Sequence, residues 1–221
     1  HGESREEVSR LLITASGGPF RGFTREQLER VQVEDALRHP NWSMGQKITI
    51  DSATLVNKGL EVMEARWLFG VDLDRIEVLV QPKSVIHSMV EFQDGAVLAQ
   101  LGTPDMHLPI QYALYYPERR PLGGERLDFA ALADITFEKP DTETFRGLPL
   151  ALAAARAGGT LPTVFNAANE RAKFLNREIR FLDIYEIIEG AMQQHRKIEH
   201  PDLEEILDAE ADTYEWIESR W

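Results

Sequence analysis

The sequence contains no cysteine in its 221 residues. Disulfides and thiolate metal sites are therefore excluded, which suits a reducing compartment. Long apolar runs are also absent, since none approaches the roughly 18 consecutive apolar residues that a membrane helix needs. No basic segment followed by an apolar one opens the chain, as it would in a secretion signal. These absences predict a soluble protein with no membrane partner.

Basic residues are scarce as well. Lysine and arginine number 24 against 37 aspartates and glutamates, which leaves a formal net charge of −13. A surface of this charge repels nucleic acids and anionic lipids, so we expect no nucleic-acid partner. Apolar residues make up 43% and charged residues 28% of the chain, which is ordinary for a folded globular protein. The length suits one large domain or two small ones, and we expect two.

The first half of the chain has the pattern of a mixed α and β structure. A short apolar element is expected over residues 6–14, before the glycine-rich loop at 15–22. Three strand-like runs follow at 76–80, 85–92 and 96–101. The sequence Gln-Asp-Gly separates the last two runs and predicts that they form a β-hairpin.

Helices are expected between the loop and these strands. Thr24 followed by Gln27 has the spacing of a capping box, which predicts a short helix. A longer helix is expected from residue 51 or 52 to about Phe69, ending at Gly70. Its apolar residues recur with spacings of four and three, which predicts one buried face: Val56, Leu60, Met63 and Trp67.

Beyond residue 116 the pattern changes. Residues 117–147 contain several prolines and glycines with little periodicity, and are expected to form a linker. Four helical runs then predict a small bundle: 148–157, 164–175, 184–194 and 203–221. The predicted fold class is therefore α+β, a sheet with an antiparallel hairpin and packed helices, followed by an all-α bundle. The expected domains are 1–116, the linker 117–147 and 148–221.

The loop Ala-Ser-Gly-Gly-Pro-Phe, residues 15–20, is the first candidate site. Gly17 and Gly18 allow the backbone to approach a ligand closely, and Ser16 adds a hydroxyl group. Such a loop can hold a phosphate group. A plain turn is the alternative, because short glycine-rich signatures often occur without a ligand.

The long helix offers a second candidate site. Ser52 is expected at its N-terminus, where backbone N–H groups and the helix dipole favour an anion. Asn57, Lys58 and Glu61 share a face because residues three and four apart are neighbours on a helix. Ser52 and Glu61 are separated by roughly 13 Å along the axis, at 1.5 Å per residue. A small phosphorylated polyol could therefore contact Ser52 and Lys58 with its phosphate, Asn57 with a hydroxyl and Glu61 with a metal-chelating end.

Two observations limit this interpretation. Asn57, Lys58, Glu61 and Glu64 could instead form a solvated helix face on which Lys58 and Glu61 pair, as most mixed-charge helix faces do. A single carboxylate also cannot hold Mg²⁺ or Mn²⁺, which need further oxygen ligands. Glu61 therefore needs partners from elsewhere.

The segment His-Pro-Asn-Trp-Ser-Met-Gly, residues 39–45, precedes this helix. A loop that exposes Trp42 and Met44 is reasonable if it closes over a site and excludes water. Packing of Trp42 into the local core is the alternative. His87 and Met106, taken singly, are interpreted as structural residues.

Several longer motifs identify a family. They are LLITASGGPFRG, HPNWSMGQKITIDSATLVNKGLEVMEARWLF, PKSVIHSMVEFQDGAVLAQLGTPDM, and NAANE at 166–170. Together they closely resemble the 1-deoxy-D-xylulose 5-phosphate reductoisomerase family, over essentially the whole chain. In that family a metal-chelated ketose phosphate rearranges its carbon skeleton, and NADPH then reduces the product to 2-C-methyl-D-erythritol 4-phosphate for isoprenoid biosynthesis.

The resemblance implies roles for individual residues. Glu61 would be a metal ligand and, with His39, a catalytic residue. A mobile flap over residues 39–46 would close over the substrate, with Met106 near the nicotinamide side, and His87 would support the site. The implied partners are a small phosphorylated ketose, NADPH, Mg²⁺ or Mn²⁺, and a second copy in a homodimer. Met44 would belong to this flap on the cofactor side. The substrate would be bound by residues of the loop, the flap and the helix: Ser16, His39, Trp42, Ser52, Asn57 and Lys58.

The chain also departs from the family pattern. The family's amino-terminal half carries a glycine-rich NADPH-binding domain and an acidic-Ser-acidic stretch with two further metal ligands. Neither occurs in these 221 residues, and no G-x-G-x-x-G pattern follows a strand. We therefore expect the carboxy-terminal part of the enzyme, without an NADPH site and inactive alone, from the bacterial cytoplasm rather than the plastid stroma. The alternative is a non-catalytic phosphosugar-binding or oligomerisation module.

Overall fold

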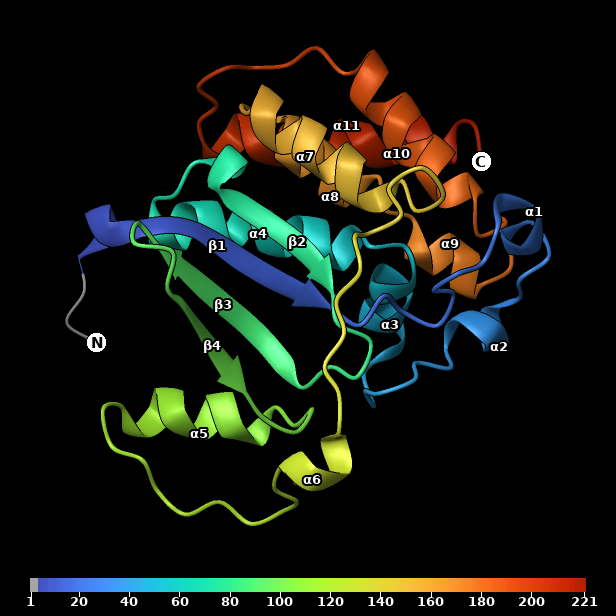
Figure 1. Cartoon of the computed structure of the whole chain (residues 1–221). Coiled ribbons are helices and arrows are strands. Elements are labelled where there is room, and N and C mark those ends of the chain that lie inside the picture. Colours follow the sequence, from blue (N-terminus) through green and yellow to red (C-terminus); the bar gives the residue numbers. More distant parts are fainter. Residues whose placement is uncertain (1–3) are drawn as a thin grey trace. The chain divides into compact units, whose positions relative to one another are not determined.

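The computed structural model describes residues 4–221 (Figure 1). The chain forms two compact units. The sheet unit contains the residues up to Ser16, Asn41–Ser43 and Glu77–Lys139. The helical unit contains Gly17–Pro40, Met44–Ile76 and Pro140–Trp221. The domain boundaries predicted at residues 116 and 147 stay a prediction.

The sheet unit is built on four strands in the order β2-β1-β3-β4. They are β1 (Val8–Ala15), β2 (Ile76–Val80), β3 (Ile86–Phe92) and β4 (Val97–Leu101). β1 pairs antiparallel with β3, and β3 pairs antiparallel with β4. β1 and β2 lie side by side and run in the same direction in Figure 1, so the sheet is mixed. The predicted α+β fold class with an antiparallel hairpin is confirmed.

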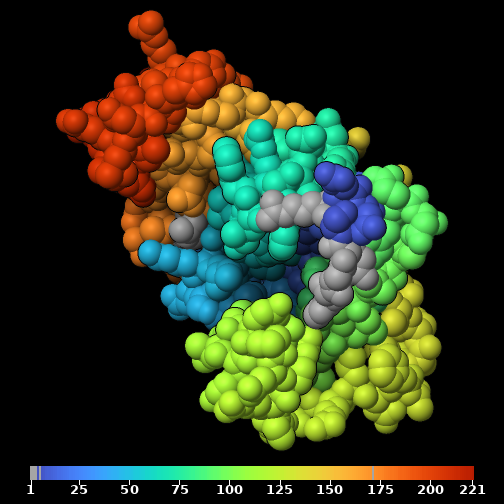
Figure 2. Space-filling view, turned by 90° about the vertical axis from the view of Figure 1, so that its left-hand side faces the viewer, coloured from blue at the N-terminus to red at the C-terminus, as the bar shows by residue number. Residues whose placement is uncertain are grey.

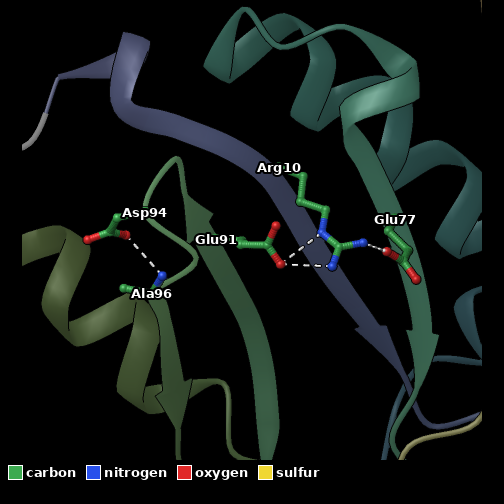
Figure 3. Close-up of polar contacts among 5 residues, drawn as sticks. All are labelled: Arg10, Glu77, Glu91, Asp94 and Ala96. Carbon is green, nitrogen blue, oxygen red and sulfur yellow. Dashed lines mark hydrogen bonds and ion pairs between the residues drawn. The ribbon is translucent and has the colours of Figure 1, made fainter.

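The turn between β3 and β4 has the chemistry that its sequence predicts. Gly95 has a φ of 86°, a conformation open to glycine and costly for other residues. The Asp94 carboxylate accepts a hydrogen bond of 2.9 Å from the Ala96 backbone N–H (Figure 3). These local contacts fix the hairpin and its register.

Arg10 ties three neighbouring strands together on one face of the sheet (Figure 3). Its Nε and Nη2 groups donate to the Glu91 carboxylate at 3.0 and 2.8 Å, and Nη1 pairs with Glu77. The hydrogen bond with Glu91 raises the pKa of Arg10, and the same bond lowers the pKa of Glu91. Such cross-strand pairs help set register. The same unit has a small apolar core of Leu12, Val85, Ile86 and Met89.

Three short helical segments complete the sheet unit. They are a 3₁₀ turn η1 (Arg5–Glu7), α5 (His107–Tyr115) and α6 (Phe129–Leu132). Every residue of α5 is exposed or half-buried, and the yellow-green residues of this helix lie at the surface in Figure 2. The sequence analysis predicted no helix over the residues of α5. The Asp105 carboxylate accepts from the His107 N–H at 2.9 Å at the start of α5.

The helical unit contains the remaining elements. The capping box of Thr24 and Gln27 is present at the start of the first helix, as predicted. The predicted helix over 164–175 is divided in two, α8 and α9. The bounds are α1 (Arg25–Leu28), α2 (Val33–Ala36), α3 (Gln46–Ala53), α4 (Val56–Phe69), η2 (Leu73–Arg75), α7 (Gly147–Ala157), α8 (Leu161–Ala167), α9 (Arg171–Leu175), α10 (Asp183–Gln194) and α11 (Leu203–Glu218).

The predicted long helix is two helices. α3 ends at Ala53 and α4 begins at Val56, because Leu55 adopts a left-handed conformation with φ 60° and breaks the hydrogen-bond ladder. The predicted start at residue 51 or 52 is therefore wrong. The predicted end at Phe69 is confirmed, with Gly70 at φ 63° as the C-cap.

Of the predicted buried face of this helix, only Val56 is buried, and the other three positions are wrong. Trp67 is 78% exposed, and Leu60 and Met63 are only half-buried. The buried face is lined by smaller residues, because α4 packs closely on α7: a Cβ at Gly59 would lie 2.2 Å from the Ala151 Cβ. The buried apolar or small residues of α4 are Val56, Gly59, Val62 and Ala65.

Across residues 4–221 no helix has both the length and the apolar character to cross a membrane.

Candidate functional site

The first turns of α4 bring together the amide, ammonium and carboxylate groups singled out in the sequence. Asn57 Nδ2 donates to Glu61 Oε1 at 2.7 Å, and Lys58 Nζ pairs with Glu61 Oε2 at 2.5 Å. The three side chains form one cluster, in agreement with their spacing of three and four. We call Asn57, Lys58 and Glu61 the α4 cluster.

The α4 cluster is not a fully solvated helix face. The Lys58 side chain is only 11% exposed, whereas that of Glu61 is 37% exposed. A mostly buried ammonium group is costly unless it is paired, so the Glu61 carboxylate stabilises it. Because Gly59 packs α4 against α7, the cluster is carried by a well-anchored helix.

Ser52 does not lie where the sequence predicts. It belongs to the last turn of α3, and its backbone carbonyl accepts from the Leu55 N–H at 3.2 Å. The argument that Ser52 caps a helix N-terminus is therefore wrong. The N-terminus nearest to this position is that of α4, whose first turn includes Asn57 and Lys58. Early backbone N–H groups and the helix dipole thus act beside the Lys58 ammonium.

The diglycine loop has a packing role within the helical unit. Gly17 and Gly18 have φ values of 88° and 69°, which favour glycine. A Cβ at Gly18 would lie 2.9 Å from the Ser52 carbonyl oxygen and 3.1 Å from the Ala53 Cα. The loop backbone therefore packs on the last turn of α3. Ser16, half-buried just after β1, belongs to the sheet unit.

A second cluster forms around Trp42 in the sheet unit. The Trp42 Nε1–H donates to Ser84 Oγ at 2.9 Å, and the Trp42 ring lies 5.9 Å from the His87 ring at 64°. Asn41 Nδ2 donates to the Pro82 carbonyl at 2.7 Å. Trp42 is thus half-buried, with contacts to Ser84 and His87, and is not part of the buried core. Its role as a closing flap stays a prediction.

The other predicted site residues are placed as follows. His39 and Met44 are half-buried in the helical unit, and burial lowers the pKa of His39. The neutral imidazole is therefore favoured at neutral pH. Met106 is 57% exposed and immediately precedes α5 in the sheet unit.

Sequence reasoning missed three residues near these clusters. Ser84 is buried with a φ of 54°, and the only local signal for it is its place in the Pro-Lys-Ser-Val-Ile-His stretch. Asp51 and Asn169 form a buried hydrogen bond of 2.7 Å over a separation of 118 residues. No local pattern could have paired them.

Comparisons with known proteins decide the family. A model described as the DXP reductoisomerase C-terminal domain matches residues 101–216. A second, described as the 1-deoxy-D-xylulose 5-phosphate reductoisomerase C-terminal domain, matches residues 1–69. The chain belongs to the 1-deoxy-D-xylulose 5-phosphate reductoisomerase family. The resemblance noted in the sequence is thereby confirmed.

Individual members of this reductoisomerase family are similar over the whole chain. The 1-deoxy-D-xylulose 5-phosphate reductoisomerase of Lachnospira eligens is 64% identical over 100% of this chain, and that of Agathobacter rectalis is 62% identical. These matches span only 59% and 58% of the relatives' own length. The chain therefore covers less than two thirds of the curated relatives.

Solved reductoisomerase structures share the fold. The enzyme from Zymomonas mobilis in complex with NADPH superposes with a TM-score of 0.87 at 45% identity, over 95% of this chain and 54% of the other. A reductoisomerase in complex with NADPH, fosmidomycin and magnesium gives a TM-score of 0.90 at 42% identity, over 96% and 55%. The predicted fold, sheet with helices and a helical C-terminal part, agrees with these neighbours.

The residues present do not make a complete metal site of the kind those neighbours suggest. Within residues 4–221, no group of three or more histidine, aspartate or glutamate side chains is placed to hold a metal ion. Glu61 supplies one carboxylate, and both of its oxygens are engaged by Asn57 and Lys58. Mg²⁺ needs about six oxygen ligands, so Glu61 fits as one ligand only.

Proposed function

We propose that this chain forms the phosphate-binding part of a 1-deoxy-D-xylulose 5-phosphate reductoisomerase. The complete enzyme would convert 1-deoxy-D-xylulose 5-phosphate to 2-C-methyl-D-erythritol 4-phosphate with NADPH and Mg²⁺ or Mn²⁺. The observation that carries the proposal is the α4 cluster, in which a mostly buried ammonium group lies at a helix N-terminus. Both features favour an oxyanion. Family membership identifies which phosphorylated ketose to test.

The substrate phosphate and the paired carboxylate compete for one cation. Lys58 now holds the Glu61 carboxylate, and an ammonium group that turns to a phosphate must weaken that pair. Glu61 then has an oxygen available for a divalent cation, so phosphate binding and metal binding would favour each other. Asn57, which donates to the other Glu61 oxygen, would keep the carboxylate oriented during this exchange.

The remaining site roles rest on the family resemblance. Glu61 and His39 are proposed as the catalytic residues, and Met106 as a residue on the nicotinamide side. Residues 39–46 are proposed as the flap, and the chain alone is proposed to be inactive. Met44 is proposed as a flap residue on the cofactor side. The proposed contacts to substrate are Ser16, His39, Trp42, Ser52, Asn57 and Lys58. The relatives described above are bacterial, which supports the bacterial cytoplasm over the plastid stroma.

Substitution of Lys58 tests the proposed function. Lys58→Ala in the intact enzyme removes a charge-assisted hydrogen bond worth about 1.5–3 kcal/mol, so the Kd for 1-deoxy-D-xylulose 5-phosphate should rise about tenfold to a hundredfold. Titration calorimetry measures it directly. Lys47→Ala is the matched control, because Lys47 is an exposed lysine on α3. Equal affinities for the Lys58 variant and the parent protein would remove the α4 cluster from the binding site.

A homodimer is a second proposal, supported by the sheet unit. β4 is an edge strand, and its Val97 and Leu98 side chains are 47% and 56% exposed. An exposed apolar edge strand is a ready surface for pairing with another chain. α5 adds the exposed side chains of Ile110 and Leu114 in the same unit. We propose that a second copy covers this surface.

A further inference from the structure

The last turn of α3 holds a buried carboxylate. Asp51 is 6% exposed and accepts a hydrogen bond of 2.7 Å from Asn169 Nδ2, and Asn169 itself is 4% exposed. A buried carboxylate is unfavourable unless neighbouring donors satisfy it. Asn169 lies in the turn between α8 and α9, so this bond joins two parts of the helical unit that are far apart in sequence.

The amide of Asn169 is specialised for this contact. Its Oδ1 atom is buried and has no hydrogen-bond partner among the described residues, while Nδ2 serves Asp51. Rotating the amide would satisfy nothing, because it would turn an oxygen toward the carboxylate oxygen. A buried amide oxygen without a partner is rare. The hydrogen bond from Nδ2 to Asp51 is therefore the polar interaction through which Asn169 stabilises this part of the helical unit.

Asp51 lies next to the elbow that joins α3 and α4. Ser52 follows it, Gly18 packs on the Ser52 carbonyl, and Leu55 makes the left-handed turn into α4. The fully buried Tyr185 of α10 places its hydroxyl 3.4 Å from the Thr54 carbonyl. Side chains from the C-terminal helices therefore contact the elbow at two points.

We infer that Asn169 is a positioning residue: by holding Asp51 it fixes the α3–α4 elbow, and with it Ser52 and the first turn of α4. This inference rests on the proposed function, since that turn carries Asn57 and Lys58. It assigns the segment Asn-Ala-Ala-Asn-Glu a purpose in shaping the phosphate site, although Asn169 itself is too buried to touch the substrate.

Hydrogen exchange of the elbow amides tests the inference without any ligand. The Thr54 N–H donates to the Ile50 carbonyl at 3.0 Å and the Leu55 N–H to the Ser52 carbonyl at 3.2 Å. In the 221-residue chain, Asn169→Ala should raise exchange at these two amides about tenfold, with little change in α11. Asn166→Ala is the control, because Asn166 is exposed in the same motif.

A reciprocal exchange of the pair separates positioning from simple stability. Asp51→Asn combined with Asn169→Asp restores one amide and one carboxylate, so exchange at Thr54 and Leu55 should return toward the parent value. If Asn169→Ala does not fold, this double variant decides alone. The inference is overturned if the elbow amides are unaffected by Asn169→Ala, if all amides accelerate equally, or if the exchanged pair gives no recovery.

Calorimetry with 1-deoxy-D-xylulose 5-phosphate in the intact enzyme completes the test. Asn169→Ala should raise the Kd about tenfold, and the exchanged pair should recover it. Asn169→Ala could raise hydrogen exchange at the elbow amides while Lys58→Ala leaves the Kd unchanged. That result would contradict the proposed function but not the positioning role of Asn169. A Kd that rises with Lys58→Ala but not with Asn169→Ala would contradict the positioning role but not the proposed function.

Discussion

Lys58 is the side chain on which the functional account depends. The Lys58 side chain is mostly buried, whereas its partner, the Glu61 side chain, is more exposed. Such a pair can open toward an incoming anion, because the exposed carboxylate can be rehydrated or bound by a cation. We therefore propose that the α4 cluster is a charge pair that opens on ligand binding, rather than a purely structural salt bridge.

Trp42 provides a test at the same scale. Ser84→Ala removes the acceptor of the Trp42 Nε1–H bond, worth about 1 kcal/mol, so the segment Asn41–Ser43 should be less tightly held. Acrylamide quenching of Trp42 fluorescence should increase. The measurement needs a background in which the other tryptophans, Trp67, Trp216 and Trp221, are replaced by phenylalanine.

Ser88→Ala is the control for that experiment, because Ser88 is an exposed serine on β3. If both serine variants leave Trp42 equally protected, the Ser84 hydroxyl does not hold the segment, and the proposed flap needs another anchor.

Single residues were predictable where their chemistry is local. The spacing of Asn57, Lys58 and Glu61 was sufficient to place them together, because helix geometry alone decides it. Ser84 and Asn169 could not be found in this way. Their partners, Trp42 and Asp51, are 42 and 118 residues distant, and only the tertiary fold brings them within bonding distance.

At the scale of elements, α3 and α4 show where sequence patterns fail. The stretch from residue 46 to 69 contains no proline and gives no signal for a break at Leu55, which is a left-handed leucine held by tertiary packing. The hairpin and the capping box were predicted correctly because their hydrogen bonds join residues two or three apart in sequence: Asp94 with Ala96, and Thr24 with Gln27. α5 was missed since its residues are apolar without a buried face.

The contact between α4 and α7 allows a stability prediction. Gly59→Ala places a Cβ 2.2 Å from the Ala151 Cβ, and overpacking of this kind costs about 1–3 kcal/mol. The loss should exceed the gain of about 1 kcal/mol from the better helix propensity of alanine. Urea denaturation of the two proteins measures the difference in the free energy of unfolding.

A compensating variant and a control variant test whether the lost stability comes from this contact. Adding Ala151→Gly to Gly59→Ala returns the space for a methyl group and should recover part of the loss. Gly123→Ala, at an exposed position with no atom within 4 Å of the added Cβ, should change stability little. A Gly59→Ala protein as stable as the parent would mean that α4 and α7 pack less closely than described, and that the α4 cluster is less firmly anchored.

At the scale of the whole molecule, the chain matches reductoisomerases over 59% or less of their length in the relatives described above. Fold class and family were predictable from sequence because long motifs carry both. The proposed metal site was not, since Glu61 is the only carboxylate of the α4 cluster and the described residues contain no group of three or more histidine, aspartate or glutamate side chains placed to hold a metal ion. A net charge of −13 makes the local positive charge of Lys58 more important for any anionic ligand.

The proposed homodimer gives a prediction for the assembled protein. Leu98→Lys places a charge on the exposed edge strand β4, so it should weaken pairing through that surface and shift the mass measured by light scattering from dimer toward monomer. Leu207→Lys, an exposed leucine of α11 in the helical unit, is the control and should leave the mass unchanged. A dimer unaffected by Leu98→Lys would place the interface elsewhere.

The most direct measurement is a crystal structure of the intact enzyme with 1-deoxy-D-xylulose 5-phosphate bound. Our account predicts that a phosphate oxygen lies within hydrogen-bond distance of Lys58 Nζ, at the N-terminus of α4, and that the Lys58–Glu61 pair has opened. A substrate phosphate bound away from α4, with Lys58 still paired to Glu61, would contradict it.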